Sequence, residues 1–291
     1  MTKIHIPRIL GILLVILTGL MFLTKTNIIG NIMKVFALTS GLILLFSKKT
    51  TTKKAFKLFT ESFINKKLLL TTIIEILFWI ITLGIITFSG IFLKSFAKSL
   101  KSAIPTKIEF LGVLPNLLSV QKYFYLAISI IIFGVFLWFL AYSTTRAISW
   151  AKLRNKKITK KYWLKFTLLN FTWWLLWTPI MILIFKGLKK EAVQIVFTIT
   201  ILLYLYLTPI LHHTFFNIHK TWETIAYTLL YSITELPKFL IPYSFAFIVL
   251  IILFFVNKAM PTKAIGLLIL TFFISWLRKY LNKYMDEIIR I

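Results

Sequence analysis

The chain has 291 residues, of which 59% are hydrophobic and 16% aromatic, and it carries 35 Lys and Arg against 8 Asp and Glu. A water-soluble domain of ordinary composition cannot bury so much apolar surface, so the composition predicts an integral membrane protein. The absence of Cys excludes disulfides, thiolate metal sites and a cysteine nucleophile.

The formal net charge is +27, and the basic residues fall almost entirely between the apolar runs. A basic protein can bind nucleic acid by neutralising phosphates. Lys and Arg beside a spanning helix are instead held to the anionic headgroups of the cytoplasmic leaflet. We therefore expect the lipid bilayer, and no nucleic acid, as the partner of these charges.

Eight apolar stretches approach the roughly 20 residues that a helix needs to cross the hydrocarbon layer. The first begins like a signal peptide, but Leu23-Thr24-Lys25 offers no small-residue cleavage site, so we expect an uncleaved span. The fold class is therefore predicted to be all-α, a polytopic bundle of about eight transmembrane helices. The predicted spans are 7–23, 28–46, 68–93, 123–145, 166–185, 193–213, 239–257 and 262–279.

The orientation follows from the basic residues in alternate loops. With the N-terminus inside, the inner segments carry roughly twice as many Lys and Arg as the outer ones, and cytoplasmic loops are the basic ones. This predicts a multi-pass protein of the plasma membrane with both termini in the cytoplasm. The predicted inner segments are 1–8, 47–67, 146–165, 214–238 and 278–291.

Three segments between or after the spans show helical periodicity. Phe56, Phe59 and Phe63 recur on one face of 53–65, and similar stripes occur in 221–234 and in the tail from Leu277 to Ile288. We interpret these segments as amphipathic helices in the headgroup layer. The alternative is a helix that is solvated or packed on the core.

The organisation suggests a two-span hairpin at 1–50 and a six-span core at 51–291 with an amphipathic tail. The core divides into three similar units, 53–145, 147–213 and 220–280, each with a helix, a basic junction and a hairpin. A threefold repeat and the ordinary alternation of a polytopic chain both explain this pattern. Gly11 would allow the first hairpin to pack closely against a neighbour.

The junction Lys161-Tyr162-Trp163-Leu164-Lys165 leads into the span that holds Asn170. With the amphipathic helices and the six-span core, it resembles poorly characterised prokaryotic, including archaeal, polytopic membrane families. The plan is similar to the membrane domain that accompanies some glycerophosphodiester phosphodiesterases, over roughly residues 53 to 285. Since the chain has no phosphodiesterase catalytic domain, the resemblance implies a membrane fold and no activity.

Glu75 lies about two turns inside the third span, where a carboxylate has to be protonated, paired or facing water. Thr71 and Thr72, one turn earlier, are expected to hydrogen-bond to it, and Arg146 is a candidate counter-ion. Such a carboxylate serves either as a proton or substrate site or as a polar clamp within a hairpin. We favour the clamp.

Asn170 lies at similar depth in the fifth span, and an amide there usually joins helices. His212, His213 and His219 end the sixth span without a carboxylate or cysteine at metal-binding spacing, so we expect no metal and no cofactor. Trp173, Trp174 and Trp177 predict a filled bundle rather than a ligand-binding wall.

The sequence has no Walker loop, no His-Glu-x-x-His and no Gly-x-Ser-x-Gly, so we expect no enzyme. The leading hypothesis is a cytoplasm-facing polar vestibule that transports or binds a small solute or lipid headgroup. The alternative hypothesis is a non-transporting membrane scaffold or accessory subunit that organises lipids or a partner protein. The vestibule would be lined by Glu75, Arg146, Asn170, His212 and Tyr243.

Overall fold

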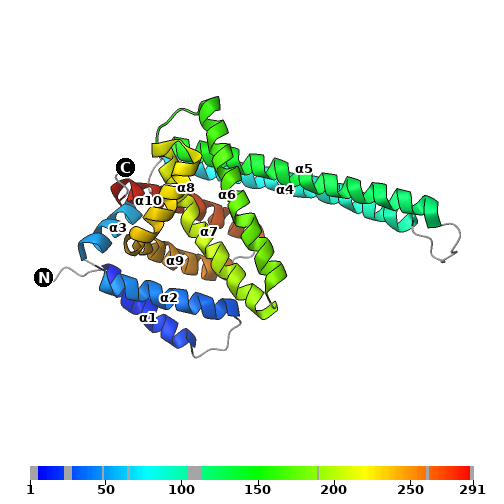
Figure 1. Cartoon of the computed structure of the whole chain (residues 1–291). Helices are drawn as coiled ribbons and strands as arrows, with labels where there is room; N and C mark the ends of the chain where they lie inside the picture. The colour runs from blue at the N-terminus through cyan, green and yellow to red at the C-terminus, as the bar shows by residue number, and fades with distance from the viewer. Residues whose placement is uncertain are drawn as a thin grey trace. The chain divides into compact units, whose positions relative to one another are not determined.

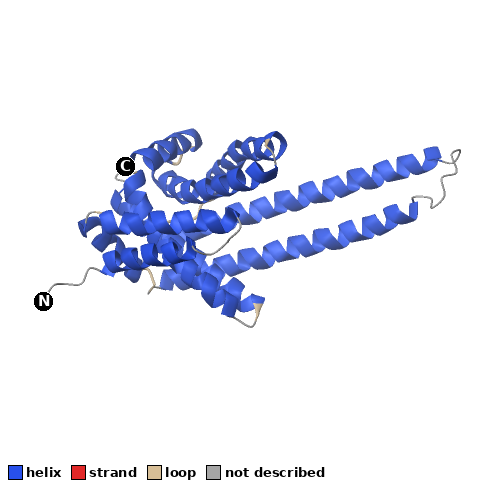
Figure 2. Cartoon of the chain, turned by 90° about the horizontal axis from the view of Figure 1, so that it is seen from below, coloured by secondary structure: helices blue, strands red, loops and turns tan. Residues whose placement is uncertain are grey.

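The structure is a computed structural model that describes residues 6–22, 28–47, 49–63, 66–103, 113–188, 190–259 and 262–288. Over these ranges every regular element is an α-helix (Figures 1 and 2), as the all-α prediction requires. The helices are α1 (Ile6–Phe22), α2 (Ile28–Phe46), α3 (Lys49–Glu61), α4 (Lys66–Ala103), α5 (Val113–Leu153), α6 (Lys160–Gly187), α7 (Lys190–Ile218), α8 (Thr221–Thr234), α9 (Leu236–Ala259) and α10 (Lys263–Ile288).

Six segments of the described helices are long and apolar enough to cross a membrane, and they contain the predicted third to eighth spans almost completely. The predicted first two spans correspond to α1 and α2, of 17 and 19 residues, which are not among the six. The six candidate segments are Lys66–Ser99, Gln121–Leu153, Lys160–Gly187, Ala192–Ile218, Leu236–Leu253 and Ala264–Glu287.

The chain forms two compact units, one of residues 1–72 and 149–291 and the other of residues 73–148. The long helices α4 and α5 each contribute to both. Residues from 147 onward continue α5 to Leu153 without a break, so no separate helix opens the predicted second repeat unit. The division at residue 50 and the threefold repeat remain predictions.

The core of the larger unit is aromatic and joins α3, α9 and α10. Phe59 of α3 lies edge-on to Trp276 and Tyr280 of α10, with centroids 5.0 and 5.7 Å apart. It also contacts Phe245 of α9 at 5.5 Å. The stripe predicted to face headgroups thus packs on neighbouring helices, because the larger apolar surface available to it is another helix. Phe63 remains partly exposed beside Trp276.

Helices α1 and α2 approach closely at two glycines. A Cβ atom on Gly11 would lie 2.9 Å from the carbonyl oxygen of Gly41, closer than real Cβ contacts allow. Leu14 and Ala37, from the two helices, pack with Phe247 of α9. The absence of two side chains therefore lets the α1–α2 hairpin form at short range, as the sequence suggested for Gly11.

Helix α8 buries its polar face and exposes its apolar face, which is the reverse of the usual arrangement in a water-soluble protein. Its buried face contains Thr224, Thr228 and Ser232, whose hydroxyls donate to backbone carbonyls of the preceding turn. Its outward face carries large apolar side chains, with Trp222 69% and Ile233 74% exposed. A helix with that pattern is unsuited to water and suited to lipid.

In the smaller unit, α4 and α5 run antiparallel as a long pair (Figure 2). Ring contacts join Phe78 to Tyr142 near one end and Phe96 to Tyr123 near the other. Between these pairs, a Cβ atom on Gly134 would meet the Ser89 hydroxyl. Most other side chains of the pair are apolar and exposed, which is the surface expected of helices surrounded by lipid.

Several segments predicted to be cytoplasmic meet at one end of the larger unit. The Lys67 ammonium, at the start of α4, donates to the Leu153 carbonyl at the end of α5 over 3.3 Å. The Tyr284 hydroxyl in α10 donates to the Lys238 carbonyl at the start of α9 over 3.0 Å. We call this region the basic end; it comprises residues 62–63, 66–67, 152–165, 216–238 and 278–287 of the larger unit.

Candidate functional site

Glu75 and Arg146 form an ion pair between α4 and α5 within the smaller unit. Glu75 is fully buried, and the Arg146 guanidinium lies over the rings of Phe78 and Tyr142, 5.2 and 5.1 Å from their centroids. The ion pair compensates both charges, and the rings add cation–π attraction. Arg146 is thus the counter-ion of Glu75, with the contacts of a clamp between two helices.

The two threonines one turn before Glu75 have a different role from the predicted one. The hydroxyls of Thr71 and Thr72 donate to the Leu68 carbonyl of their own helix, over 3.0 and 2.8 Å. A helical threonine readily makes this backbone contact, because the carbonyl three or four residues earlier lies within reach. We expected both hydroxyls to donate hydrogen bonds to Glu75, but they donate to the backbone instead.

Asn170 of α6 and His212 of α7 form a buried polar pair, with Oδ1 and Nε2 2.8 Å apart. Since the amide oxygen can only accept, the imidazole donates from Nε2 in this arrangement. The His212 ring also contacts Phe166 and Trp150, at centroid distances of 4.9 and 5.9 Å. Within the described chain, the Asn170 amide nitrogen and the Trp150 indole nitrogen are buried without a hydrogen-bond partner.

Tyr243 takes part in a separate chain of contacts. Its hydroxyl donates to the Tyr206 carbonyl over 2.9 Å, and the Tyr206 hydroxyl donates to the Ser232 carbonyl over 2.8 Å. These bonds join α9, α7 and α8. Among the described residues, no hydrogen bond or ring contact links Tyr243 to Asn170. The structure therefore pairs Asn170 with His212 but uses Tyr243 elsewhere on α7.

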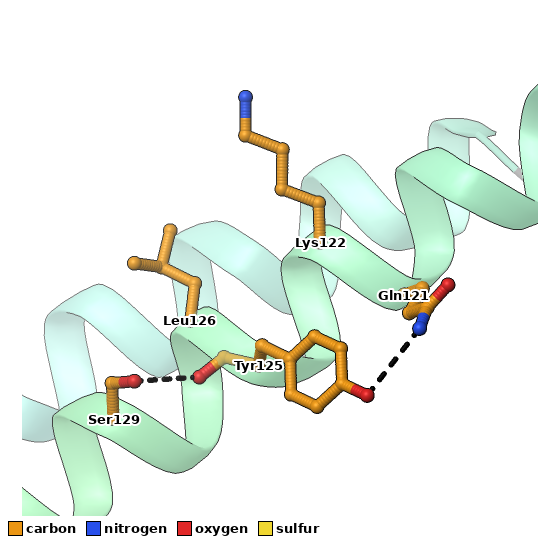
Figure 3. A pocket seen from close by; sticks show the side chains of 5 residues that line it. All are labelled: Gln121, Lys122, Tyr125, Leu126 and Ser129. Atoms are coloured by element: carbon orange, nitrogen blue, oxygen red, sulfur yellow. Dashed lines mark hydrogen bonds between the residues drawn. The ribbon is translucent and has the colours of Figure 1, made fainter.

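The pocket in Figure 3 lies on the described part of α5 in the smaller unit, near the start of its apolar segment. The Gln121 amide donates to the Tyr125 hydroxyl over 3.3 Å, and the Ser129 hydroxyl donates to the Tyr125 carbonyl over 2.9 Å. All of its lining side chains are exposed, and none belongs to the predicted vestibule. They are Gln121, Lys122, Tyr125, Leu126 and Ser129.

A polar network at the basic end was not predicted from the sequence. Arg154 donates to the side-chain oxygens of Asn217 and Asn282, each over 3.0 Å, and forms an ion pair with Asp286. Asp286 also lies 3.0 Å from Nε2 of the buried His213. A single guanidinium thus joins the ends of α5, α7 and α10. Arginine can do this because its planar guanidinium carries several N–H donors that point in different directions.

The end of α5 places Arg154 in this network. Asn155 has a φ of 54°, and the Lys156 amide donates to the Ala151 carbonyl over 2.9 Å, as in a Schellman motif. Arg154 is the last residue before this turn. Burial lowers the pKa of Arg154 and the nearby Asp286 carboxylate raises it, but arginine remains charged at any physiological pH.

Lysine side chains cover the end of α7. The ammonium groups of Lys156 and Lys165 donate to the carbonyls of Phe216 and His219, over 3.0 and 3.3 Å. Cations are favourable at a helix C-terminus, where unpaired carbonyls and the helix dipole present negative charge. Burial, together with Lys156 and Lys165, holds the pKa of His219 below its ordinary value. His219 is therefore neutral at pH 7.

The histidines and tryptophans singled out in the sequence have separate partners. His212 bonds to Asn170, whereas His213 faces Asp286. Among the described residues, no three His, Cys, Asp or Glu side chains are grouped to hold a metal. Trp173 is buried and donates to the Thr208 hydroxyl over 3.1 Å, but Trp174 is exposed, so only part of the tryptophan cluster fills the bundle.

Comparisons of the chain with protein-family models, with curated proteins and with solved structures find no match. The resemblance drawn from the sequence therefore remains a prediction.

Proposed function

We propose that the chain is a multi-pass protein of the plasma membrane that gathers anionic lipid headgroups at its cytoplasmic face without transporting a solute. The observation that carries the proposal is the concentration of cations at the basic end. Lys152, Lys157, Lys160 and Lys161 are exposed around the α5–α6 connection, beyond the cations that join helix ends. Anionic headgroups are the ligands that such a surface attracts.

Helix α8 supports the same proposal. It connects α7 to α9, which both contain candidate membrane spans, and it exposes Trp222, Leu229, Leu230 and Ile233. In the proposed orientation, α8 lies in the cytoplasmic interface with this apolar face in lipid. The basic end would then be held at the depth of the headgroup phosphates.

The lipid proposal is tested by analysing the lipids that copurify with the protein. The wild type should retain anionic phospholipid in a larger proportion than the host membrane contains. A Lys157→Gln, Lys160→Gln, Lys161→Gln variant should lose much of this enrichment. A matched variant with Lys94→Gln, Lys98→Gln and Lys122→Gln, exposed lysines of the α4–α5 hairpin, should keep it. Equal retention by both variants would contradict the proposal.

The proposed topology has eight spans, with α1 and α2 crossing, and both termini in the cytoplasm. Because the chain lacks Cys, single cysteines can be introduced without background labelling. Lys157→Cys should react with an impermeant maleimide only after the cells are opened. Leu188→Cys, in the exposed α6–α7 connection, should react on intact cells. The reverse pattern would invert the proposed orientation.

A second candidate function is the polar vestibule, with transport or binding of a small solute. It is favoured by the buried donors on Asn170 and Trp150, which have no acceptor within the described chain. Buried donors of this kind are commonly satisfied by water or by a ligand with acceptor atoms. Both side chains lie around His212, so a polar interior site would centre on that ring.

Reconstituted vesicles distinguish the two candidates. Uptake of a solute that depends on the protein and falls with Asn170→Leu would support the vestibule, provided that the variant folds. Glu75→Gln is the corresponding test in the smaller unit. If the protein only gathers headgroups, neither the wild type nor the two variants should show protein-dependent uptake of any solute in a panel of small solutes.

A further inference from the structure

Lys279 of α10 is a buried cation that has no counter-ion among the described residues. Its side chain is buried, with 3% of the residue exposed. Its ammonium donates to the Ser62 carbonyl, just after the end of α3, over 2.9 Å. Among the described residues no carboxylate lies within ion-pair distance of this ammonium. One hydrogen bond leaves two of its three N–H donors unused.

Two further lysines add positive charge at the same place. Lys283, one turn further along α10, and Lys67, at the start of α4, both repel the Lys279 ammonium electrostatically. Lys283 is partly exposed and forms an ion pair with Glu61, in which its Nζ lies 3.6 Å from a carboxylate oxygen. Lys279 and Lys283 therefore both lie at the end of α3, where Lys283 has the Glu61 carboxylate and Lys279 has the Ser62 carbonyl.

Burying an ammonium without an anion is unfavourable, because the low-dielectric surroundings do not replace its hydration. The carbonyl at the end of α3 compensates only part of the charge. An external anion with several acceptor oxygens would compensate the rest and would use the donors that remain on Lys279. A phosphate group has this charge and this number of acceptors.

We infer that Lys279, with Lys67 and Lys283, forms a binding site for a phosphate group at the basic end, and that the phosphate belongs to a lipid headgroup. The lipid source rests on the proposed function, which puts the basic end at headgroup depth. Lys67 directly precedes the apolar run that starts at Leu68, and Lys279 follows the uncharged run that ends at Leu277, so each lies at the end of an apolar run. Headgroup phosphates occupy that boundary.

The test uses the full chain in a neutral detergent, with the thermal unfolding midpoint measured during titration with phosphatidylglycerol, phosphatidylcholine or inorganic phosphate. The wild-type midpoint should rise with phosphatidylglycerol. Lys279→Met should weaken the apparent affinity about tenfold or more, as expected for the loss of a charge-assisted hydrogen bond. Lys98→Met, at an exposed lysine of the α4–α5 hairpin, should bind like the wild type. Lys279→Arg keeps the positive charge and should retain most of the binding. It is the control that distinguishes loss of the charge from a folding defect caused by substitution at this position.

The outcomes test the Lys279 phosphate site and the proposed headgroup-gathering function separately. If phosphatidylglycerol raises the midpoint of the wild type and of Lys279→Met equally, the Lys279 site is wrong while the proposed function stands. If no lipid affects the wild type, the proposed function fails. A rise with inorganic phosphate alone, lost in Lys279→Met, would keep the phosphate site but overturn its lipid source.

Discussion

Gly11 and Gly41 bring α1 and α2 so close that a single added methyl group would meet the backbone of the other helix. Backbone cannot move aside as a flexible side chain does, so Gly11→Ala should destabilise the α1–α2 hairpin by about 1–3 kcal/mol, the usual cost of overpacking. The measurement is the unfolding midpoint in detergent.

Gly84→Ala is the matched control for this substitution. Gly84 is also helical, but a Cβ atom there meets nothing within 4 Å. Alanine should therefore be neutral or stabilising by up to about 1 kcal/mol, because it has the higher helix propensity. An equal loss at both positions would show that the close approach of α1 and α2 is unimportant for stability.

The Glu75–Arg146 pair gives a second prediction. Replacing either partner alone leaves one buried charge uncompensated, so Glu75→Gln and Arg146→Met should each destabilise the protein by about 3–5 kcal/mol. The double variant should recover part of that loss, since both charges are gone. A thermal double-mutant cycle measures the coupling, and additive losses would argue against a clamp.

The Asn170–His212 hydrogen bond should contribute less. Interhelical hydrogen bonds in membranes average about 0.6 kcal/mol, so Asn170→Leu and His212→Phe should show a coupling of that order in a double-mutant cycle. A larger coupling, above about 2 kcal/mol, would mean that a bound water or ligand depends on both side chains.

His219 ends α7 in a left-handed conformation, with a φ of 58°, and its amide donates to the Phe215 carbonyl over 2.8 Å. Glycine adopts this conformation without the penalty of a Cβ atom. His219→Gly should therefore raise the stability at pH 8 by up to about 1 kcal/mol, less the lost contact of its ring with Phe215. Val at this position should be destabilising, which provides the opposite control.

The same residue predicts a pH dependence. The folded pKa of His219 lies below its ordinary value of 6.5, so the unfolded chain takes up this proton first as the pH falls. This contribution to stability should be fully present above pH 6.5 and should decrease as the pH falls below 6.5, and His219→Gly should flatten that part of the profile. An unchanged profile in the glycine variant would assign the dependence to other groups.

The third to the eighth of the predicted spans could be located from the sequence, because apolar run length defines them. Glu75 and Arg146 could be matched because each interrupts an apolar stretch, and such charges need partners. The direction of the Phe59 stripe could not be decided, since core packing and lipid contact select the same periodicity. Only the position of Trp276 and Tyr280 settles it.

The networks of the basic end were inaccessible for a different reason. Arg154 and Asp286 are far apart in the sequence and sit in segments that already contain many charges, so no spacing distinguishes them. Lys279 looked like one more interfacial lysine. Its burial and its lack of a carboxylate partner depend on how α10 packs against the end of α3.

Helix α4 has 38 residues, a length of about 57 Å at 1.5 Å per residue, whereas the hydrocarbon layer is about 30 Å thick. A rod of that size tilts or protrudes in an ordinary bilayer. Lys94 and Lys98, near its far end, are solvent-seeking and favour protrusion. A thicker, sterol-rich membrane would embed a longer part of α4 in its hydrocarbon layer than a thin membrane would. The reach of this helix into the aqueous phase is therefore set by the host bilayer as well as by the sequence.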